Sequence, residues 1–239
     1  MRQKIRRGLV LISLLLFPLT LNYFSPYVPI HGAMTGIVSG SLLLFAVMFI
    51  TSIFFGRAWC AWVCPMAGLS DMALGVNNKN VNIKTLKIMR YSIYSIWILF
   101  IIIMFVSAGG IKGINPFHLT ENIVSVDAPV KYIIYYSVLA IFVILTFALG
   151  KRGACHSICW MSPFLTIGCS LGRLIKFPQI RIKLVAEKCS DCGICDNKCP
   201  MSIKVSSCVK QGYIKTSDCI LCGECVDNCK KGALKYEIK

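Results

Sequence analysis

Eight cysteines toward the end of the sequence have the spacing of iron–sulfur ligands. They form two runs with the same pattern, Cys-x2-Cys-x2-Cys-x3-Cys, and proline follows the first run. In chains with two such runs, the first three cysteines of a run bind one [4Fe-4S] cluster and the fourth binds the other cluster. The spacing therefore predicts cluster 1 on Cys189, Cys192, Cys195 and Cys229, and cluster 2 on Cys219, Cys222, Cys225 and Cys199.

Zinc ribbons also use Cys-x2-Cys pairs and are the main alternative for these eight thiols. A zinc ion takes four ligands, so the third cysteine of each run and its x3 spacing have no use in a zinc site. One departure from the cluster pattern is that Lys230, rather than proline, follows Cys229. Because that proline shapes the chain where it leaves the cluster, we expect its absence to expose cluster 1.

Two further cysteine pairs mark an internal repeat. Cys60-x3-Cys64 and Cys155-x3-Cys159 each follow one or two basic residues, and the pairs are 95 positions apart (60 to 155, 64 to 159). On a helix, residues i and i+4 share a face, so each pair can present two thiolates together. If the repeat brings both pairs together, they form a four-thiolate site.

The content of that four-cysteine site is left open by the sequence. A third iron–sulfur centre is one interpretation, but soft thiolate ligands also suit zinc. A dithiol–disulfide relay is another interpretation. Four buried cysteines that only pack as small hydrophobic residues are the remaining one, which the repeated spacing disfavours.

The segments that must position these cysteines are strongly apolar. Of the 239 residues, 56% are hydrophobic and 15% are charged, against about 25% charged residues in a soluble domain. This composition excludes an ordinary soluble globule, a disordered chain and a fibrous protein. Spanning a bilayer takes about 20 apolar residues, and four runs are long enough: Gly8–Phe24, Ala33–Phe55, Tyr91–Ala108 and Tyr132–Leu149.

We therefore predict an α-helical transmembrane domain of four helices, arranged as two tandem helix pairs, over residues 1–177. Both Cys-x3-Cys motifs are expected at its cytoplasmic boundary. Residues 178–239 are predicted to form a small α+β domain of the bacterial two-cluster ferredoxin type. The first and last strands of that domain are expected at Ile182–Lys188 and Leu234–Ile238.

The basic residues predict the orientation of the chain. Lysine and arginine gather in residues 1–7, 57–90 and 151–152, whereas residues 25–32 have none. By the positive-inside rule, the chain is a multi-pass protein of the cytoplasmic membrane, with both termini and the ferredoxin domain in the cytoplasm. The net charge of +16 then reflects membrane flanks and compensation of anionic clusters. Membrane lipid, rather than nucleic acid, is the expected partner.

No catalytic residue is assigned among the remaining reactive side chains. His31 and His118 fall in predicted outer loops, and because no histidine lies inside a predicted span, no haem is expected. His156 is one candidate to accept a proton from a quinol, although such a residue more often only packs. Cys169 and Cys208 belong to no group and are predicted to be structural thiols.

These motifs resemble the NapH/NosR family of four-helix membrane ferredoxins. The resemblance rests on Arg57 to Pro65, on Cys155 to Cys159 and on the tandem cysteine runs in the same order, and it covers nearly the whole chain. Without a large extracytoplasmic flavin domain of the NosR kind, the sequence matches the short, NapH-like form better. One departure is Trp160, which stands where the first motif has Pro65.

The resemblance implies a membrane-anchored iron–sulfur protein that passes electrons between the quinone pool, or a membrane partner, and another redox protein. It has two [4Fe-4S] clusters, with a third centre and a bound quinone as further expectations. The chain is interpreted mainly as an electron carrier, which leaves open whether it is the quinol-oxidising subunit of a larger complex. The alternative is an assembly or regulatory factor that uses the Cys-x3-Cys site during maturation of a redox enzyme.

Overall fold

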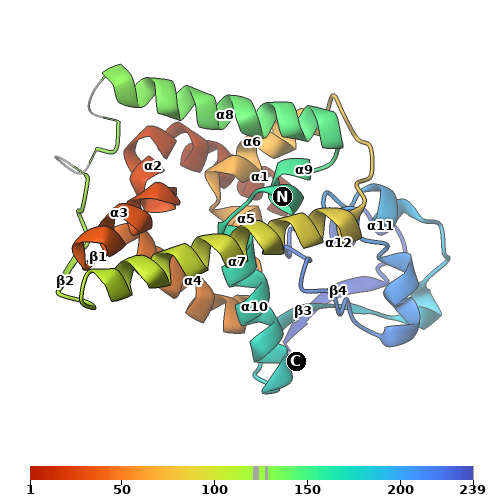
Figure 1. The fold of residues 1–239 in the computed structure, drawn as a ribbon. Coiled ribbons are helices and arrows are strands. Elements are labelled where there is room, and N and C mark those ends of the chain that lie inside the picture. The colour runs from red at the N-terminus through yellow and green to blue at the C-terminus, as the bar shows by residue number, and fades with distance from the viewer. Residues whose placement is uncertain (121–123, 127–128, 239) are drawn as a thin grey trace.

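The computed structural model describes residues 1–120, 124–126 and 129–238. A helical part (residues 1–177) carries a smaller cysteine-rich part (residues 178–238) at one end (Figure 1). Among the described residues, two helices are long and apolar enough to cross a membrane: α7 (Ile83–Ser107) and α8 (Pro129–Leu149). They contain nearly all of the third and fourth predicted spans. Asn82 caps α7 by accepting a hydrogen bond from the amide of Thr85.

The first predicted span, Gly8–Phe24, is not one straight helix. The chain forms α1 (Arg2–Leu15) and α2 (Phe17–Phe24), whose axes are bent by 82°. Pro18 lies in the first turn of α2, where it has no amide hydrogen to donate and its ring crowds the carbonyl four residues earlier. The first predicted span is therefore not confirmed as one helix, and the pair adds a third crossing only if it is counted as one broken span.

The second predicted span, Ala33–Phe55, is also interrupted. Helix α3 (Tyr27–Thr35) ends at Gly36, whose φ of +74° favours glycine, and strand β1 (Ile37–Ser39) follows. The next helix, α4 (Gly40–Phe55), has 16 residues, fewer than the roughly 20 that usually cross a bilayer. Strand β1 pairs in parallel with β2 (Gly113–Asn115), which satisfies backbone groups at this break. Four uninterrupted spanning helices are therefore not confirmed, and the described residues contain two or three candidate spans.

Short helices connect the long ones and approach the cysteine-rich part. They are α5 (Trp59–Trp62), α6 (Pro65–Ala73) and α9 (Gly153–Ser157). Helix α10 (Met161–Leu174) packs closely on α4. A Cβ at Gly168 would lie 2.5 Å from the carbonyl oxygen of Phe49, and one at Gly172 would lie 2.4 Å from that of Ile53. Close backbone contact between α4 and α10 therefore requires these two glycines.

The cysteine-rich part is built on a two-stranded antiparallel sheet. Strand β3 (Ile180–Leu184) pairs with β4 (Leu234–Ile238), and Ile182 faces Tyr236 in the register. The predicted closing strand is confirmed, whereas the opening strand begins earlier than predicted and ends at Leu184. The chain then forms 3-10 helix η1 (Ala186–Lys188), α11 (Ile194–Asn197), 3-10 helix η2 (Ser206–Gln211) and α12 (Glu224–Asp227).

Replacing Gly172 tests the contact between α4 and α10. We expect Gly172→Ala to destabilise the protein by about 1–3 kcal/mol, because the added methyl group overpacks a backbone contact. Gly8→Ala on α1 is the matched control, since a Cβ there meets no atom within 4 Å and alanine favours a helix. Thermal unfolding in detergent measures both variants, and equal melting temperatures for the two would contradict this packing.

Candidate functional site

Three cavities are each lined by one of the predicted sets of four cysteines. Site 1 contains Cys189, Cys192, Cys195 and Cys229. Site 2 contains Cys199, Cys219, Cys222 and Cys225. Site 3 contains Cys60, Cys64, Cys155 and Cys159, so the two halves of the repeat do meet. The structure thus brings together residues that are up to 99 positions apart in the sequence (60 to 159).

Short helices, rather than one long helix, position each cysteine pair of site 3. Cys60 lies in α5, and Cys64 lies beyond the end of α5 as the N-cap of α6. Cys155 lies in α9, and Cys159 follows that helix. The expected i, i+4 pairing on one continuous helix is therefore wrong, because both helices stop after about one turn. The chain is extended at Cys64, which is the conformation that a following proline favours.

Buried nitrogen atoms with no hydrogen-bond partner surround site 3. Arg57, Trp59 and Arg152 line the cavity. Within the described part of the chain, the Nε atoms of both arginines and the indole Nε1 of Trp59 are buried and bond to no acceptor. An unsatisfied buried donor costs about 1–3 kcal/mol. Three residues that line site 3 with its four cysteines thus each have an unpartnered buried donor.

Buried arginines connect site 3 to the cysteine-rich part. Arg57 and Arg90, each 1% exposed, both contact one carboxylate oxygen of Asp218, at 3.2 Å and 3.0 Å. Both also donate to the hydroxyl of Ser162, at 2.8 Å and 2.9 Å. Arg57 Nη2 lies 3.8 Å from Cys60 Sγ. Asp218 immediately precedes Cys219, so this ion-pair group joins site 2 to site 3.

A second ion-pair group includes Arg152, which lines site 3. Asp71 accepts hydrogen bonds from Arg6 and Arg152, both at 2.6 Å. Arg152 also donates to the carbonyl oxygen of Cys60 at 3.0 Å, and Arg6 pairs with Glu224 in the cysteine-rich part. Four arginines that are at most 2% exposed thus share three carboxylates. The surplus of buried positive charge favours a negatively charged group nearby.

The ionisation of these side chains follows from their burial and neighbours. Burial would raise the pKa of Asp71, but Arg152 and Arg6 outweigh burial and hold that pKa below its ordinary value. Burial, and then the neighbouring cysteines, raise the pKa of Cys159 to about 12. Burial likewise raises the pKa of Cys64 and Cys155. Four thiolates at site 3 therefore need a positively charged centre to hold them together.

Sites 1 and 2 differ in their surroundings. Apolar side chains surround the cysteines of site 2, and no charged side chain among the described residues lines it. Site 1 is a cavity of about 290 Å³ with Lys188, Asp191, Lys230 and Lys231 in its lining, and Cys192 is exposed. This agrees with the expectation that a lysine in place of proline after Cys229 leaves this site more open.

Zinc fits the three sites less well than an iron–sulfur cluster does. Four thiolates around one zinc ion lie about 2.3 Å from a common point. Among the described residues, no three histidine, cysteine, aspartate or glutamate side chains converge closely enough to hold a single metal ion. The sulfur atoms of site 1 surround a cavity of about 290 Å³, which suits a ligand of several atoms, whereas the cavities at site 2 and site 3 are about 20 Å³ and 10 Å³. The donor sets are therefore compatible with [4Fe-4S] clusters.

The cysteines outside the three sites have structural surroundings. Cys169 Sγ lies 3.7 Å from Gln179 Oε1, and Cys208 Sγ lies 3.7 Å from the carbonyl oxygen of Lys204. Neither cysteine lines site 1, site 2 or site 3.

One of the two histidines predicted in outer loops lies in a helix, while His118 lies in a turn, as predicted. His31 lies in α3 rather than in a loop, and its Nδ1 is 2.9 Å from Nε2 of His118. His156 is completely buried, and burial lowers the pKa of its imidazole to about 3. The role of His156 as a proton acceptor stays a prediction.

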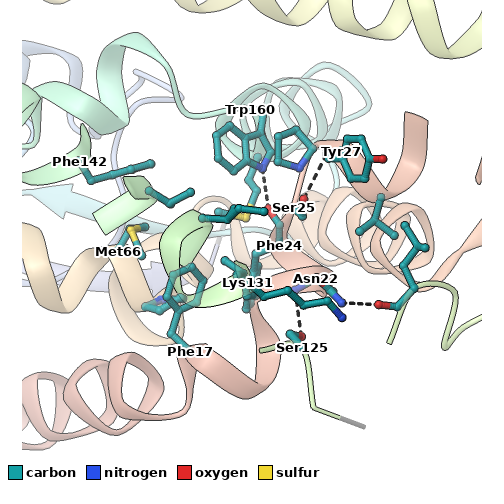
Figure 2. A pocket seen from close by; sticks show the side chains of 18 residues that line it. Phe17, Asn22, Phe24, Ser25, Tyr27, Met66, Ser125, Lys131, Phe142 and Trp160 are labelled. Atoms are coloured by element: carbon teal, nitrogen blue, oxygen red, sulfur yellow. Dashed lines mark hydrogen bonds between the residues drawn. The ribbon is translucent and has the colours of Figure 1, made fainter. Parts of the chain in front are cut away.

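An apolar pocket (Figure 2) shares two lining residues with site 3. Its volume is about 280 Å³, and Phe17, Phe24, Phe142 and Trp160 provide aromatic walls. Trp160 is fixed there because its indole N–H donates to the carbonyl oxygen of Phe24 at 2.7 Å. A few polar side chains also line the pocket: Asn22, Ser25, Ser125 and Lys131. Met66 and Met161 line both this pocket and site 3.

Sequence reasoning missed the residues that join the two parts of the chain. Asp71 is the only acidic residue among the first 120, and that isolation is a signal that could have identified it. The sequence indicates only a membrane flank for Arg90, although it is buried against Asp218, 128 positions away. Ser162 carries no sequence signal for its contact with two arginines.

Two family models match separate segments of the chain. Residues 38–84 match a model described as a 4Fe-4S binding domain, and this segment contains Cys60 and Cys64. Residues 188–234 match a model described as a 4Fe-4S dicluster domain, and this segment contains all eight cysteines of sites 1 and 2. No solved structure matches the chain.

Several curated proteins are similar to most of the chain. An uncharacterized protein of Methanocaldococcus jannaschii is 28% identical over 76% of this chain and 64% of its own length. The putative electron transport protein YccM of Escherichia coli is 24% identical over 85% of this chain and 57% of its own. The ferredoxin-type protein NapH of Haemophilus influenzae is 25% identical over 77% of this chain and 63% of its own length. The chain thus spans less than two thirds of these three relatives.

These comparisons confirm the predicted resemblance to NapH-like proteins and support an iron–sulfur electron carrier. The apolar helices and the relatives together indicate an association with a membrane.

Replacing Asp218 tests the buried ion-pair group. We expect Asp218→Asn to destabilise the protein by about 3–5 kcal/mol, because Arg57 and Arg90 would keep their buried charges without a carboxylate. Asp227→Asn is the control, because Asp227 pairs with Arg2 and both side chains are 32% exposed; we expect a loss of at most about 1 kcal/mol. Thermal unfolding compares the two, and a loss for Asp218→Asn no larger than the control's would contradict a buried pair.

Proposed function

We propose that this chain, a NapH-like ferredoxin-type protein, passes single electrons between a quinol held in the membrane and another redox protein. Three iron–sulfur centres at sites 1, 2 and 3 would carry the electrons. The single observation that carries this proposal is that the pocket, site 3 and site 2 lie in series and share wall residues. A bound [4Fe-4S] cluster supplies a one-electron carrier, and the chain positions, shields and electrically balances it.

Spacing and geometry support [4Fe-4S] clusters at sites 1 and 2. The ligands would be Cys189, Cys192, Cys195 and Cys229 at site 1, and Cys219, Cys222, Cys225 and Cys199 at site 2. The fourth cysteine of each run lines the cavity of the other run, as the two-cluster pattern requires. The match of residues 188–234 to a dicluster model supports the same assignment.

The surroundings of site 3 support a third, negatively charged iron–sulfur centre there. Cys60, Cys64, Cys155 and Cys159 would be its ligands. A cluster with four thiolates offers sulfur acceptors to the three unpartnered N–H groups of Arg57, Trp59 and Arg152. It would also balance the surplus of buried arginine charge. Protonated thiols or a disulfide would neither provide these acceptors nor balance the arginine charge. The dithiol–disulfide relay and the interpretation of four cysteines that only pack are therefore disfavoured.

The apolar pocket supports quinol binding beside site 3. A ligand pocket of this kind is lined by apolar and aromatic side chains with a few polar groups that orient the ligand. Trp160 and Phe142 have rings on which a quinone ring could pack, and Asn22 and Ser125 supply polar groups. Met66 and Met161 line both this pocket and site 3, so a ligand in the pocket would lie close to site 3.

A second shared wall continues the series. Met201 and Ile220 line both site 3 and site 2. Electrons that reach site 3 would therefore enter the cysteine-rich part at site 2. The ion pairs of Asp218 with Arg57 and Arg90 hold site 2 in this position, next to Cys219.

We propose further that the three sites lie at the cytoplasmic face of the cytoplasmic membrane. The bent pair α1–α2 would be one broken span and α4 a short one, which gives four crossings with α7 and α8. Arg6, Arg57, Arg90 and Arg152, from the segments predicted to be cytoplasmic, are buried, and the first three contact carboxylates of the cysteine-rich part. Their position supports that orientation by the positive-inside rule.

A double variant at site 3 tests the third centre. Cys60→Ser/Cys155→Ser should remove about four of roughly twelve iron atoms per chain, retain the absorption of the other two clusters and abolish reduction by a quinol analogue. Cys169→Ser/Cys208→Ser is the control and should keep all of its iron, because neither cysteine lines a site. Full iron content in the first variant would rule out the third centre and favour a role for site 3 in assembly of another enzyme.

A substitution that fills the pocket tests quinol binding separately from cluster binding. Val138 lines the pocket, whereas Ile141 on the same helix is 48% exposed. We expect Val138→Trp to slow reduction of the clusters by a quinol analogue by about tenfold or more, since the indole occupies the ligand's space. The clusters of Ile141→Trp should be reduced at the rate of the unmodified chain, and both variants should keep their iron. Equal rates for the two variants would place the quinol elsewhere.

A further inference from the structure

The two iron–sulfur sites of the cysteine-rich part are not equivalent. Site 2 has Cys199, Cys222 and Cys225 buried, and its described lining is apolar apart from the thiols. Site 1 has Cys192 exposed and a cavity of about 290 Å³. Transfer between two proteins requires that a redox centre of one approach the surface that contacts the other. Site 1 meets that requirement and site 2 does not.

Site 1 also lies at the far end of the series. Site 2 shares Met201 and Ile220 with site 3, whereas no described residue lines both site 1 and site 3. Site 1 is joined to site 2 through the contact between α11, which carries Cys195, and α12, which carries Cys225. The order from the membrane is therefore the pocket, site 3, site 2 and site 1.

The charges around site 1 favour an acidic partner. Lys188, Lys230 and Lys231 line the cavity and are exposed, and Asp191 is the one carboxylate in the described lining. Lys230 and Lys231 directly follow Cys229. Long, exposed cationic side chains around a redox centre steer a negatively charged protein toward it, and steering raises the association rate more than the affinity.

We propose that site 1 is the place where this chain exchanges electrons with a soluble redox protein whose docking face is acidic. The inference rests on the proposed function, since it needs a cluster at site 1. In each event one electron leaves the centre at site 1 and reduces the partner by one electron, or passes in the opposite direction. No bond forms or breaks and no proton is transferred. Lys188, Lys230 and Lys231 bring the partner to the site without binding either cluster.

The experiment uses the full chain with its clusters, reduced by dithionite, and an acidic flavodoxin as the probe. Stopped-flow absorption measures the electron transfer rate. We expect Lys230→Glu/Lys231→Glu to lower the rate by about tenfold at low ionic strength. The rate of the unmodified chain should fall as salt is added. Lys4→Glu/Lys215→Glu is the control, with equal charge change at exposed positions outside the lining of site 1; its rate should stay within about twofold of the unmodified rate.

A small cation, hexaammineruthenium(III), is the second probe. With this acceptor the Lys230→Glu/Lys231→Glu variant should react faster than the unmodified chain, because the sign of the attraction is reversed. If both variants react alike with both probes, the proposal that a partner with an acidic docking face binds at site 1 is wrong. A slower reaction of the variant with both probes would also contradict it, since that result points to a damaged cluster rather than to lost attraction.

A variant that removes the cluster from site 1 tests the exit position itself. Cys189→Ser/Cys192→Ser should lose exchange with flavodoxin while the centre at site 2 is still reduced by dithionite. An unchanged flavodoxin rate would show that the exit lies elsewhere. Dithionite bypasses the quinol pocket and site 3, so these results do not depend on quinol oxidation. If the purified chain has no cluster absorption at all, the proposed function fails before the docking test begins.

Discussion

The arrangement of this molecule depends on buried arginines that bind carboxylates from both of its parts. Asp218 of the cysteine-rich part lies between Arg57 and Arg90 of the helical part, and Glu224 contacts Arg6. Burying these charges is costly unless each is paired. Because the buried arginines outnumber the carboxylates, an anionic group nearby is favoured, and two of these arginines, Arg57 and Arg152, line site 3. The same contacts hold site 2 against site 3, so the proposed path for electrons depends on the ion pairs that hold the two parts together.

The departures from four simple spans build the pocket. The bend between α1 and α2 at Pro18 turns α2 so that Phe17, Leu21 and Phe24 become pocket walls. Trp160 stands where the first repeat has Pro65, and its indole closes the pocket by donating to Phe24. The repeat is therefore symmetric at the cysteines and asymmetric around them. That asymmetry places the apolar pocket where Met66 and Met161 separate it from site 3.

The sequence allowed the cysteine sets to be predicted because ligand spacing is local and the repeat is visible in the residues. It also allowed α7 and α8 to be predicted, since each is a continuous apolar run, and strand β4, since its apolar and polar residues alternate. Hydropathy did not reveal the breaks near Pro18 and Gly36, because apolar composition continues through both. The contact of Arg90 with Asp218 joins residues 128 positions apart and could not be derived from spacing. The unpartnered N–H groups around site 3 depend on tertiary packing and could not be derived from residue types or spacing.

The most direct test of the account is the iron and acid-labile sulfide content of the full chain, purified without oxygen. Three [4Fe-4S] centres in series predict about twelve iron and twelve sulfide per chain. About eight of each would contradict the third centre and remove the link between the pocket and site 2. Zinc at two per chain, with no visible absorption, would contradict the iron–sulfur account altogether.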